Sequence, residues 1–450
     1  MKTITKNIIE SWINIFFNYD PHAWEMEIMA KRIIAWSSNT DITLEDSDKE
    51  YKKKLFVSLI KQSNFLSKNL KNLFDGPEKI VCCASIILSG MIFEKNEGNY
   101  KIGIKELEKI IKNYFDESGF PKSRNPEDVF ISLKYLILIR EWLKEGQKSI
   151  PDFLNNIIVK CGACYAMLSC ANKQFPLFNG ATETNYKDYD IFLKNLKYKF
   201  IYKNHSIADF IKIKKKKFDF IIDCGNPPPS TYSKYYQAGC LSFELVSNKQ
   251  KVICNSGFGK YFSNKLMDLS RSTAAHSTLY INDTSSCIFH KNNLINKIYG
   301  SSLLSKHRVT EKNFTEEKDY YSISGSHNGY EKKYGYIHKR TIKISKKDDK
   351  IFCIDELKKT KKNSNLLNYC IRFHIYPDTK IVKTMARNSV LISLSNGEGW
   401  SLFSETNNFE IEKNIFLGNK NKIINNECIF ISGNIEKETV YIKWKIEKVS

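Results

Sequence analysis

The sequence predicts an α+β multidomain chain, with a helical N-terminal half and an antiparallel β-sandwich in its C-terminal half. Three observations predict this fold class. At 450 residues the chain is too long to form one ordinary hydrophobic core. Apolar residues recur at helical spacing up to about residue 201, and they alternate with polar residues from about residue 218 onward. We therefore expect two domains, at residues 1–205 and 206–450.

The helical half contains amphipathic segments. Two apolar stripes predict helices that each bury one face, formed by Trp24, Ile28, Met29, Ile33 and Trp36 and by Phe56, Leu59, Leu66, Leu70 and Leu73. Residues 80–93 are apolar nearly all round, which is typical of an inner helix covered on every side. Pro126 fits the first turn of a further helix, with Asn125 as its N-cap.

In the second half, short alternating segments follow one another without long helices between them. This pattern is typical of a layered antiparallel β-sandwich. The segments that we expect to be strands are residues 218–224, 241–246, 252–255, 276–282, 319–325, 336–344, 351–357, 369–376, 390–395, 400–403, 429–433 and 439–445.

A formal net charge of +21 favours an anionic partner, such as an acidic polysaccharide. Only 8 of the 70 basic residues are Arg, so a lysine-rich composition explains the charge equally well. The sequence has no recognisable nucleic-acid-binding motif, and we expect no nucleic-acid partner.

No apolar run reaches the length of about 18 residues that crosses a bilayer, so we expect no transmembrane segment. Nothing in the sequence predicts the oligomeric state.

The first residues, MKTITKNIIESWINIFF, lack the uninterrupted apolar region and the cleavage site of a signal peptide, so we expect no signal peptide.

Twelve cysteines are scattered along the chain. The single Cys-x-x-Cys pair, Cys161 and Cys164, has no second pair at zinc-finger spacing. Buried free thiols are the simpler interpretation, and disulfides stay open as an alternative if the protein is exported.

Two segments concentrate histidine, arginine and tyrosine: Arg271–Asp283 and Gly325–Arg340. If strict alternation holds through the first segment, one polar face of a strand carries His276, Thr278, Tyr280 and Asn282. A single histidine on a strand is more often a hydrogen-bonded structural residue than a catalyst. Two such segments with arginine and tyrosine nearby favour a functional site.

The motifs RSTAAHSTL, SHNGY, HKRT and RFHIYPD resemble the C-terminal half of the heparinase II/III-like family, whose studied members are polysaccharide lyases. The resemblance implies an incomplete (α/α) toroid followed by an antiparallel β-sandwich, with a cleft between them for an acidic, uronic-acid-containing polysaccharide. Such lyases act by β-elimination: a base removes the C5 proton beside a neutralised carboxylate, and an acid protonates the leaving oxygen. The family also implies the cell envelope or periplasm, with the cytoplasm as the alternative because no signal peptide is found.

The resemblance also suggests which residues act. His276 matches the histidine of the family's sandwich domain, and we expect it to be the general base or to orient that base. His327 and Tyr330 match the family's His-x-Gly-Tyr segment, and Arg271 is a candidate partner for the negative charge of the substrate. These four residues are the catalytic candidates.

Five further residues are candidates for substrate binding. Arg124, next to Asn125, lies in a loop that resembles one at the mouth of the family's toroid, and its guanidinium suits a carboxylate or sulfate. An exposed loop arginine without a ligand is the alternative. Asn179 lies in a turn that faces the cleft in relatives, or is only a turn former. His338 and Arg340 bind substrate, or else form a buried polar network.

We expect no cofactor. Some relatives bind a structural Zn²⁺ ion near the sandwich histidine, and His276 and His327 match two ligands, but no aspartate matches at the relatives' spacing except, locally, Asp283. Two histidines alone make a weak metal site. The toroid positions that carry catalytic residues in relatives differ here, and Gln237 stands where relatives have a histidine. A non-catalytic glycan-binding protein of the same fold is therefore the alternative to a lyase.

Overall fold

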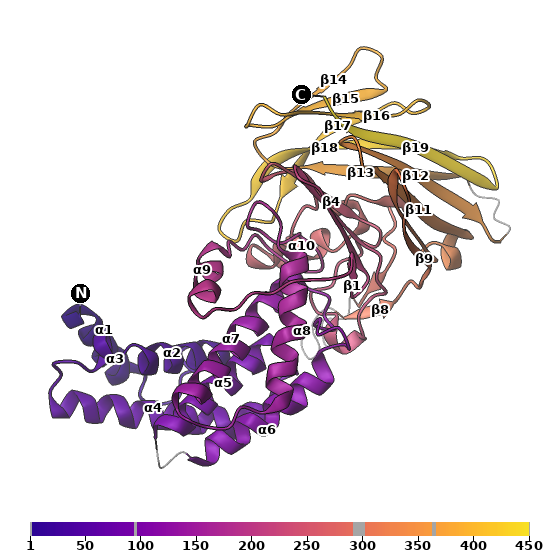
Figure 1. The fold of residues 1–450 in the computed structure, drawn as a ribbon. Helices are drawn as coiled ribbons and strands as arrows, with labels where there is room; N and C mark the ends of the chain where they lie inside the picture. Colours follow the sequence, from indigo (N-terminus) through magenta and orange to yellow (C-terminus); the bar gives the residue numbers. More distant parts are fainter. Residues whose placement is uncertain (1, 94–96, 291–301, 362–365, 450) are drawn as a thin grey trace. The chain divides into compact units, whose positions relative to one another are not determined.

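The computed structural model describes residues 2–93, 97–290, 302–361 and 366–449. The chain divides into two compact units, one comprising residues 1–121 and 128–163 and the other residues 122–127 and 164–450. Helices coloured indigo to magenta in Figure 1 make up the first unit, and the described strands lie in the second. The first strand begins at Ser206, whereas the second unit also takes in residues 164–205.

The N-terminal region is helical, as the periodicity predicts. Its helices are α1 (Lys2–Phe16), α2 (Met26–Ser38), α3 (Thr40–Thr43), α4 (Lys49–Asn69), α5 (Pro77–Ile92), α6 (Glu97–Tyr114), α7 (Pro126–Glu145) and α8 (Asp152–Leu168), with a 3-10 turn at Leu70–Asn72. The side chain of Asn125 accepts a hydrogen bond from the Glu127 N–H at 2.9 Å, which confirms the predicted N-cap of α7.

Helix α5 is the inner helix of the first unit. Every residue from Lys79 to Gly90 is buried, which confirms the prediction made from its all-round apolar character. A Cβ atom on Gly90 would lie 2.3 Å from the backbone nitrogen of Tyr100, so the close approach of α6 requires glycine there. The two apolar stripes are only partly buried, since Ile28 is 54% and Phe56 37% exposed.

Two antiparallel sheets form the second unit. The first has the order β1 (Ser206–Ile207), β2 (Phe210–Lys214), β3 (Phe218–Asp223), β4 (Phe243–Ser247), β5 (Gln250–Cys254), β13 (Leu367–Ile375), β18 (Ile424–Ile435), β17 (Glu410–Phe416), and β6 (Leu279–Ile281) also pairs with β13. The second has the order β14 (Lys380–Lys383), β15 (Ser389–Ser393), β16 (Gly399–Phe403), β19 (Thr439–Lys448), β12 (Lys350–Lys359), β11 (Tyr336–Ser345), β10 (Tyr320–His327), β9 (Val309–Glu316).

Small elements complete this unit. They are the helices α9 (Lys187–Asn195), α10 (Asn264–Ser270) and α12 (Glu331–Tyr334), the 3-10 turns at Ser230–Tyr232, Gly259–Tyr261 and Thr273–Ala275, and a separate hairpin of β7 (Ile288–Phe289) and β8 (Leu303–Ser305). All twelve cysteines are free and buried, as expected. Among the helices that the structure describes, none combines the length and hydropathy needed to cross a bilayer.

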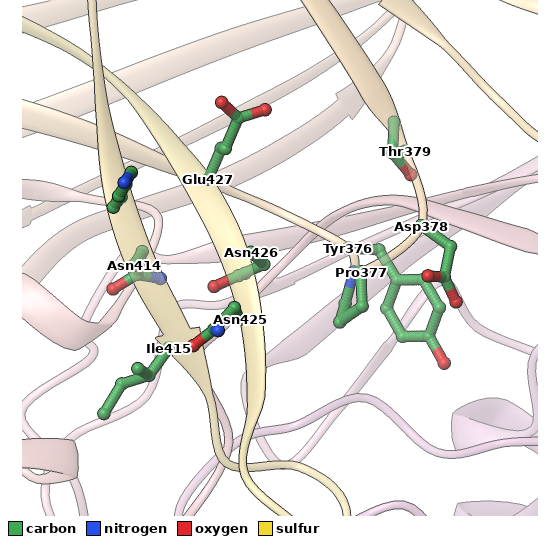
Figure 2. Close-up of a pocket in the computed structure, with 10 residues that line it drawn as sticks. Tyr376, Pro377, Asp378, Thr379, Asn414, Ile415, Asn425, Asn426 and Glu427 are labelled. Atoms are coloured by element: carbon green, nitrogen blue, oxygen red, sulfur yellow. The ribbon is translucent and has the colours of Figure 1, made fainter.

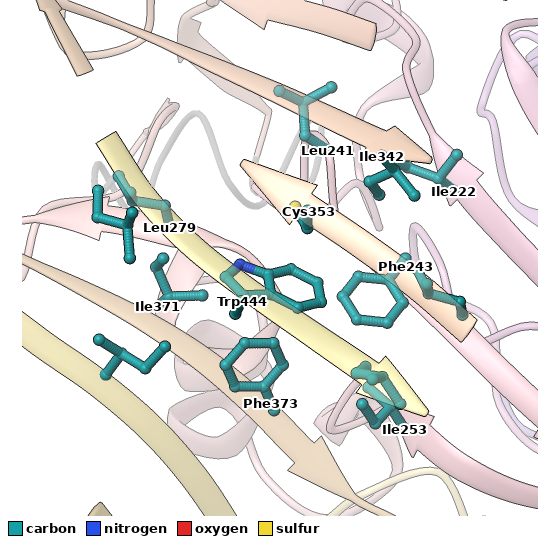
Figure 3. Packing of buried hydrophobic residues seen from close by; sticks show 14 of the residues in the cluster. Ile222, Leu241, Phe243, Ile253, Leu279, Ile342, Cys353, Ile371, Phe373 and Trp444 are labelled. Carbon is teal, nitrogen blue, oxygen red and sulfur yellow. The ribbon is translucent and has the colours of Figure 1, made fainter. Parts of the chain in front are cut away.

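Side chains from both large sheets meet in one hydrophobic core (Figure 3). The indole of Trp444 on β19 stacks against Phe243 on β4, with ring centroids 5.6 Å apart, and meets the edge of Phe373 on β13 at 4.9 Å. The indole nitrogen of Trp444 donates to the Asp355 carboxylate at 2.8 Å, so this buried donor is paired. The sheets therefore pack face to face as a sandwich, which confirms the predicted fold class.

Candidate functional site

His276 lies in the interior of the sandwich unit. It follows the 3-10 turn Thr273–Ala275 with extended backbone, and only 1% of the residue is exposed. The predicted strand over residues 276–282 is shorter than expected, because only Leu279–Ile281 pairs with β13 and all three of those residues are buried. The prediction of a polar strand face carrying this histidine is therefore wrong: the imidazole is enclosed.

The ring of His276 lies near the Ser270 carbonyl but is not well placed to bond it. Neither ring nitrogen meets the geometry of a hydrogen bond with any residue that the structure describes. Burial lowers the pKa of His276 to about 3, against a smaller opposing effect of the Ser270 carbonyl, so the imidazole is neutral at pH 7. A Cβ atom at position 239 would lie 2.8 Å from the ring carbon Cγ, so Gly239 makes the space for the imidazole.

Gln237 has a structural role. Its amide accepts from the Gly180 N–H at 2.8 Å and donates to the carbonyls of Gly257 at 2.9 Å and Ser270 at 2.6 Å. The side chain is fully buried. It therefore fixes the backbone on both sides of α10, directly before the His276 turn.

A second buried histidine, His374, supports the same turn. Its Nε2 contacts the Ala274 carbonyl at 2.9 Å, and its Nδ1 lies 3.0 Å from both Ser256 Oγ and Asn414 Nδ2. A carbonyl only accepts, so Nε2 carries the proton and Nδ1 accepts from the other two groups. Burial, with a further effect of Arg372 and His276, lowers the pKa of His374 to about 3 and keeps this tautomer neutral.

Asn414 also lines a pocket of about 630 Å³ at the end of β13 (Figure 2). β13 pairs with β18 only as far as His374, opposite Cys428, so the first residues of β18, from Ile424 to Glu427, have no strand pairing on that side. Figure 2 shows Asn414, Asn425 and Asn426 on one side of the space and Tyr376 to Thr379 on the other. The lining is Tyr376, Pro377, Asp378, Thr379, Lys413, Asn414, Ile415, Asn425, Asn426 and Glu427.

His327 and His338 lie in a separate network, together with Arg340. Nδ1 of His327 accepts from the Gly329 N–H at 3.1 Å, so its protonated Nε2 donates to His338 Nδ1 at 3.2 Å. His338 Nε2 then donates to Asp355 at 2.7 Å, and Arg340 donates to both oxygens of that carboxylate at 2.7 and 3.0 Å.

These groups are buried and mutually satisfied. Burial alone would raise the pKa of Asp355, but Arg340 and His338 hold it below its usual range. Burial and His338 lower the pKa of His327, so that ring is neutral. The geometry corresponds to the buried polar network that the sequence leaves open as the alternative for His338 and Arg340.

Tyr330 and Arg271 are also enclosed. Tyr330 is fully buried, its hydroxyl donates to the Leu279 carbonyl at 3.0 Å, and burial raises its pKa. Arg271 is 1% exposed and donates from Nε to the Tyr236 carbonyl at 2.9 Å and from Nη2 to the Ser233 carbonyl at 3.0 Å. Its Nη1 has no partner among the described residues, and burial lowers its pKa to about 10. Arg271 is thus a buried cation that forms no ion pair with a carboxylate in the described part of the chain, and its guanidinium lies 3.8 Å from the centre of the Phe289 ring.

Arg124 and Asn179 meet at one carboxylate. The Arg124 Nη2 lies 2.6 Å from Asp223 Oδ1, and the Asn179 Nδ2 lies 2.9 Å from Asp223 Oδ2 and 3.2 Å from the Arg124 carbonyl. All three residues are largely buried, and Asn125 is the buried N-cap of α7. The alternative of an exposed loop arginine is therefore wrong. An anionic ligand at Arg124 would compete with Asp223.

The described residues do not fit a structural zinc ion. No three His, Cys, Asp or Glu side chains converge on a point within residues 2–93, 97–290, 302–361 and 366–449. Both ring nitrogens of His327 take part in hydrogen bonds, and the His276 ring occupies the space that a side chain at position 239 would fill. A site built from these two histidines has no third ligand here.

The sequence candidates thus fall into separate groups, and the structure adds residues that the motifs do not single out. Asp223 and Asp355 hold the arginines, and His374 and Asn414 link the His276 turn to the pocket. The alternation of RFHIYPD places His374 on the polar side of its strand, which is the one signal for it in the sequence. The aspartates carry no comparable signal, because pairing across a fold is not visible in one sequence.

Comparison with known proteins finds a matching family and similar structures. The sequence model of the family described as heparinase II/III-like, C-terminal, matches residues 205–445. Heparinase III has a TM-score of 0.76 at 16% identity, over 99% of this chain and 73% of that one. A heparan sulfate lyase mutant from Pedobacter heparinus has a TM-score of 0.74 at 13% identity, over 99% and 72%.

The chondroitin AC lyase of Streptomyces coelicolor A3 has a TM-score of 0.54 at 6% identity, over 96% of this chain and 68% of that one. At these identities the structures share the fold, and the neighbours are polysaccharide lyases. A search of the curated proteins gives no match. The family match, which covers more than half of the chain, identifies this protein as a member of the heparinase II/III-like family.

Proposed function

We propose that the protein is a polysaccharide lyase that cleaves an acidic, uronic-acid-containing polysaccharide by β-elimination. Its structural neighbours are named for heparan sulfate and chondroitin, which are acidic glycans. The observation that carries the proposal is the imidazole of His276, which is neutral and has both nitrogens unbonded among the described residues. A buried polar group without a partner destabilises a fold by about 1–3 kcal/mol, and a bound substrate would supply the missing partner.

In the proposed reaction, a neutral imidazole supplies the lone pair that accepts the C5 proton of the uronate. The pKa of about 3 makes His276 a weak base in the free protein. A bound carboxylate beside the ring would raise that pKa, because an opposite charge stabilises the imidazolium. The C5–H electrons form the new C4–C5 double bond while the C4–O bond breaks, and the leaving oxygen takes up a proton.

Arg271 remains the candidate for the negative charge of the substrate. It is a buried guanidinium whose Nη1 has no partner among the described residues, and it lies five residues before His276. A buried cation is costly unless an anion or several hydrogen bonds compensate it. A uronate carboxylate is an anion of the required kind.

A continuous absorbance assay tests the proposed reaction. The purified protein is mixed with heparan sulfate, chondroitin sulfate, alginate and polygalacturonate, and the ultraviolet absorbance of the unsaturated product is followed. We expect turnover on at least one polymer and a loss of about 100-fold or more in the His276→Ala variant, because a general base contributes about 10²–10⁴-fold. No absorbance change on any acidic polymer would count against catalysis.

A non-catalytic glycan-binding protein of the same fold is the second candidate. Tyr330, His327 and His338 all form hydrogen bonds in the interior, which supports this alternative because none of them is free to protonate a leaving group. Saturable binding of an acidic glycan by the unaltered protein without turnover, and with the same affinity after His276→Ala, would favour it over the lyase.

The proposed partner is a polysaccharide, and the proposed location is the cell envelope or periplasm. All twelve cysteines are buried, so an oxidising compartment would not readily cross-link the folded chain. Fractionation of cells that express the full-length protein tests this location directly.

A further inference from the structure

A second pocket, of about 470 Å³, lies away from the His276 turn in the segment between α8 and β1. Its volume falls within the range of about 300–1,000 Å³ that is usual for small-molecule sites. Eleven residues line it: Tyr165, Ala166, Ser169, Lys173, Asp190, Leu193, Lys194, Lys197, Tyr198, Lys199 and Phe200. All of them belong to the second unit of the chain.

The pocket is strongly basic. Four of its eleven lining residues are lysines, whereas the whole chain has 70 Lys and Arg among 450 residues, so the lysines are enriched here. The single carboxylate is already occupied: Asp190 accepts from Lys173 at 2.6 Å and from the Tyr165 hydroxyl at 2.7 Å.

The remaining three lysines, Lys194, Lys197 and Lys199, are exposed, and none forms an ion pair with a residue that the structure describes. The pocket at the end of β13 differs in sign, because it has one lysine beside two carboxylates, Asp378 and Glu427. Of the two pockets, the one next to α9 is therefore suited to an anion.

Aromatic rings give this pocket a flat apolar surface as well. The rings of Tyr198 and Phe200 lie 5.8 Å apart with planes inclined by 27°, and Tyr165 lines the side formed by α8. A pyranose ring has apolar C–H faces and polar edges. Aromatic faces flanked by ammonium groups therefore match a sugar that carries a carboxylate or sulfate.

The end of α9 sets the position of Lys197. Helix α9 ends where the Tyr198 N–H bonds the Leu193 carbonyl at 2.8 Å and the Lys197 N–H bonds the Lys194 carbonyl at 3.0 Å. Lys197 itself has φ of 62°, the left-handed conformation that helix ends normally give to glycine. A lysine at this position carries a backbone penalty and contributes a charge to the pocket.

We propose that this pocket binds one anionic sugar unit, a uronate or a sulfated residue, of the polysaccharide. The inference rests on the proposed acidic substrate, but it concerns binding and needs no catalysis. Lys194, Lys197 and Lys199 attract the acidic group, and the Tyr198 and Phe200 rings hold the sugar face.

The test compares two glycine substitutions that make the same chemical change. Lys197→Gly and Lys249→Gly each remove one exposed lysine from a left-handed position, with φ of 62° and 70°, and Lys249 lies in the β4–β5 turn outside the pocket. Both variants relieve backbone strain, so neither is expected to lower the melting temperature. Both lower the net charge by one.

Binding is measured by calorimetry with heparan sulfate and polygalacturonate oligosaccharides, in a His276→Ala background so that the probes stay intact. We expect Lys197→Gly to weaken binding about 3–10-fold, with a smaller dependence on salt, and Lys249→Gly to leave it unchanged. Adding Lys194→Gln and Lys199→Gln should weaken binding further.

Equal losses in the two glycine variants, or no loss in either, would overturn the proposal, as would the absence of binding to every acidic oligosaccharide. If a single-stranded DNA oligonucleotide binds more tightly than the acidic oligosaccharides, and if that binding also depends on Lys197, the assignment to a sugar would be overturned. Lys197-dependent binding of an acidic oligosaccharide by a protein that shows no lyase turnover would uphold the pocket and refute the proposed reaction.

Discussion

At the scale of single residues, the enclosed histidines decide how the protein responds to acid. Burial lowers the pKa of His276, His307 and His374 to about 3 and that of His327 and His338 below the usual value. Each is neutral in the fold, whereas an unfolded histidine takes up a proton below a pH of about 6.5. The stabilisation is therefore complete above pH 6.5 and is lost progressively as the pH falls toward 3.

The contribution of His276 to this behaviour is measurable. His276→Gln removes one titrating group, so the decrease of the free energy of unfolding between pH 6.5 and 4 should become shallower by up to about 1.4 kcal/mol per pH unit. Denaturant unfolding at four pH values measures it, with the exposed His22→Gln as a control of unchanged slope. An unchanged slope in His276→Gln would show that the ring is protonated in the fold.

Gly239 is the residue that makes room for the imidazole. In Gly239→Ala the new methyl group would lie 2.8 Å from His276 Cγ, so the ring must move. We expect a loss of about 1–3 kcal/mol in stability, as for other overpacked sites, and a loss of turnover larger than the loss of folded protein. Gly98→Ala, whose new methyl group meets no atom within 4 Å, is the control that should lower neither stability nor turnover. Full activity in Gly239→Ala would mean that the position of His276 does not matter.

At the scale of elements, one buried carboxylate joins three strands of the second sheet. Asp355 on β12 accepts from His338 and Arg340 on β11 and from Trp444 on β19. These strands are neighbours in the order of the sheet. The register of the central strands is thus fixed by polar contacts as well as by apolar packing.

Removing this carboxylate should be costly. Asp355→Asn leaves the Arg340 guanidinium buried without a counter-charge, and we expect about 3–5 kcal/mol of destabilisation. Glu410→Gln removes one partner of the exposed Lys383–Glu410 pair and should cost less than about 1 kcal/mol. Both values come from denaturant unfolding at pH 7. A similar small effect of the two substitutions would contradict a network that fixes the sheet.

The strands that the sequence predicts correctly are those in the middle of the sheets. Alternation is clear in β11 and β12, because burial alternates along each of these strands. β9 and β17, which the sequence does not predict, lie at sheet edges, and only Val309 of β9 is buried. An edge strand with polar residues on both faces carries no alternation to detect.

The candidate site is less predictable than the fold for a related reason. Alternation assigns His276 to an exposed face, but β6 is covered on both sides and its three residues are all buried. Asp223 lies 99 residues after Arg124, and Asp355 lies opposite Arg340 on the neighbouring strand, a register that the sequence alone does not give. The periodicity of one segment does not show whether its second face is also covered. It also does not show which other segments it contacts.

At the scale of the whole molecule, the chain combines a family fold with a lysine-rich composition. The heparinase II/III-like match covers residues 205–445, and the similarity to heparinase III extends over 99% of the chain. The net charge of +21 is spread along the sequence, but the pocket next to α9 concentrates three unpaired lysines among the described residues. Long-range attraction to an acidic polymer is thus combined with one local place for an anionic sugar.

The central claim is that an enclosed imidazole removes a proton from an acidic sugar so that the glycan is cut by elimination. Mass spectrometry of products formed briefly in ¹⁸O-labelled water, and reduced with borohydride before the anomeric oxygen exchanges, tests it most directly, because elimination adds no solvent oxygen and hydrolysis adds one. We predict unsaturated products without label from the unaltered protein and no product from His276→Gln. Label in the products, or undiminished cleavage by His276→Gln, would contradict the account.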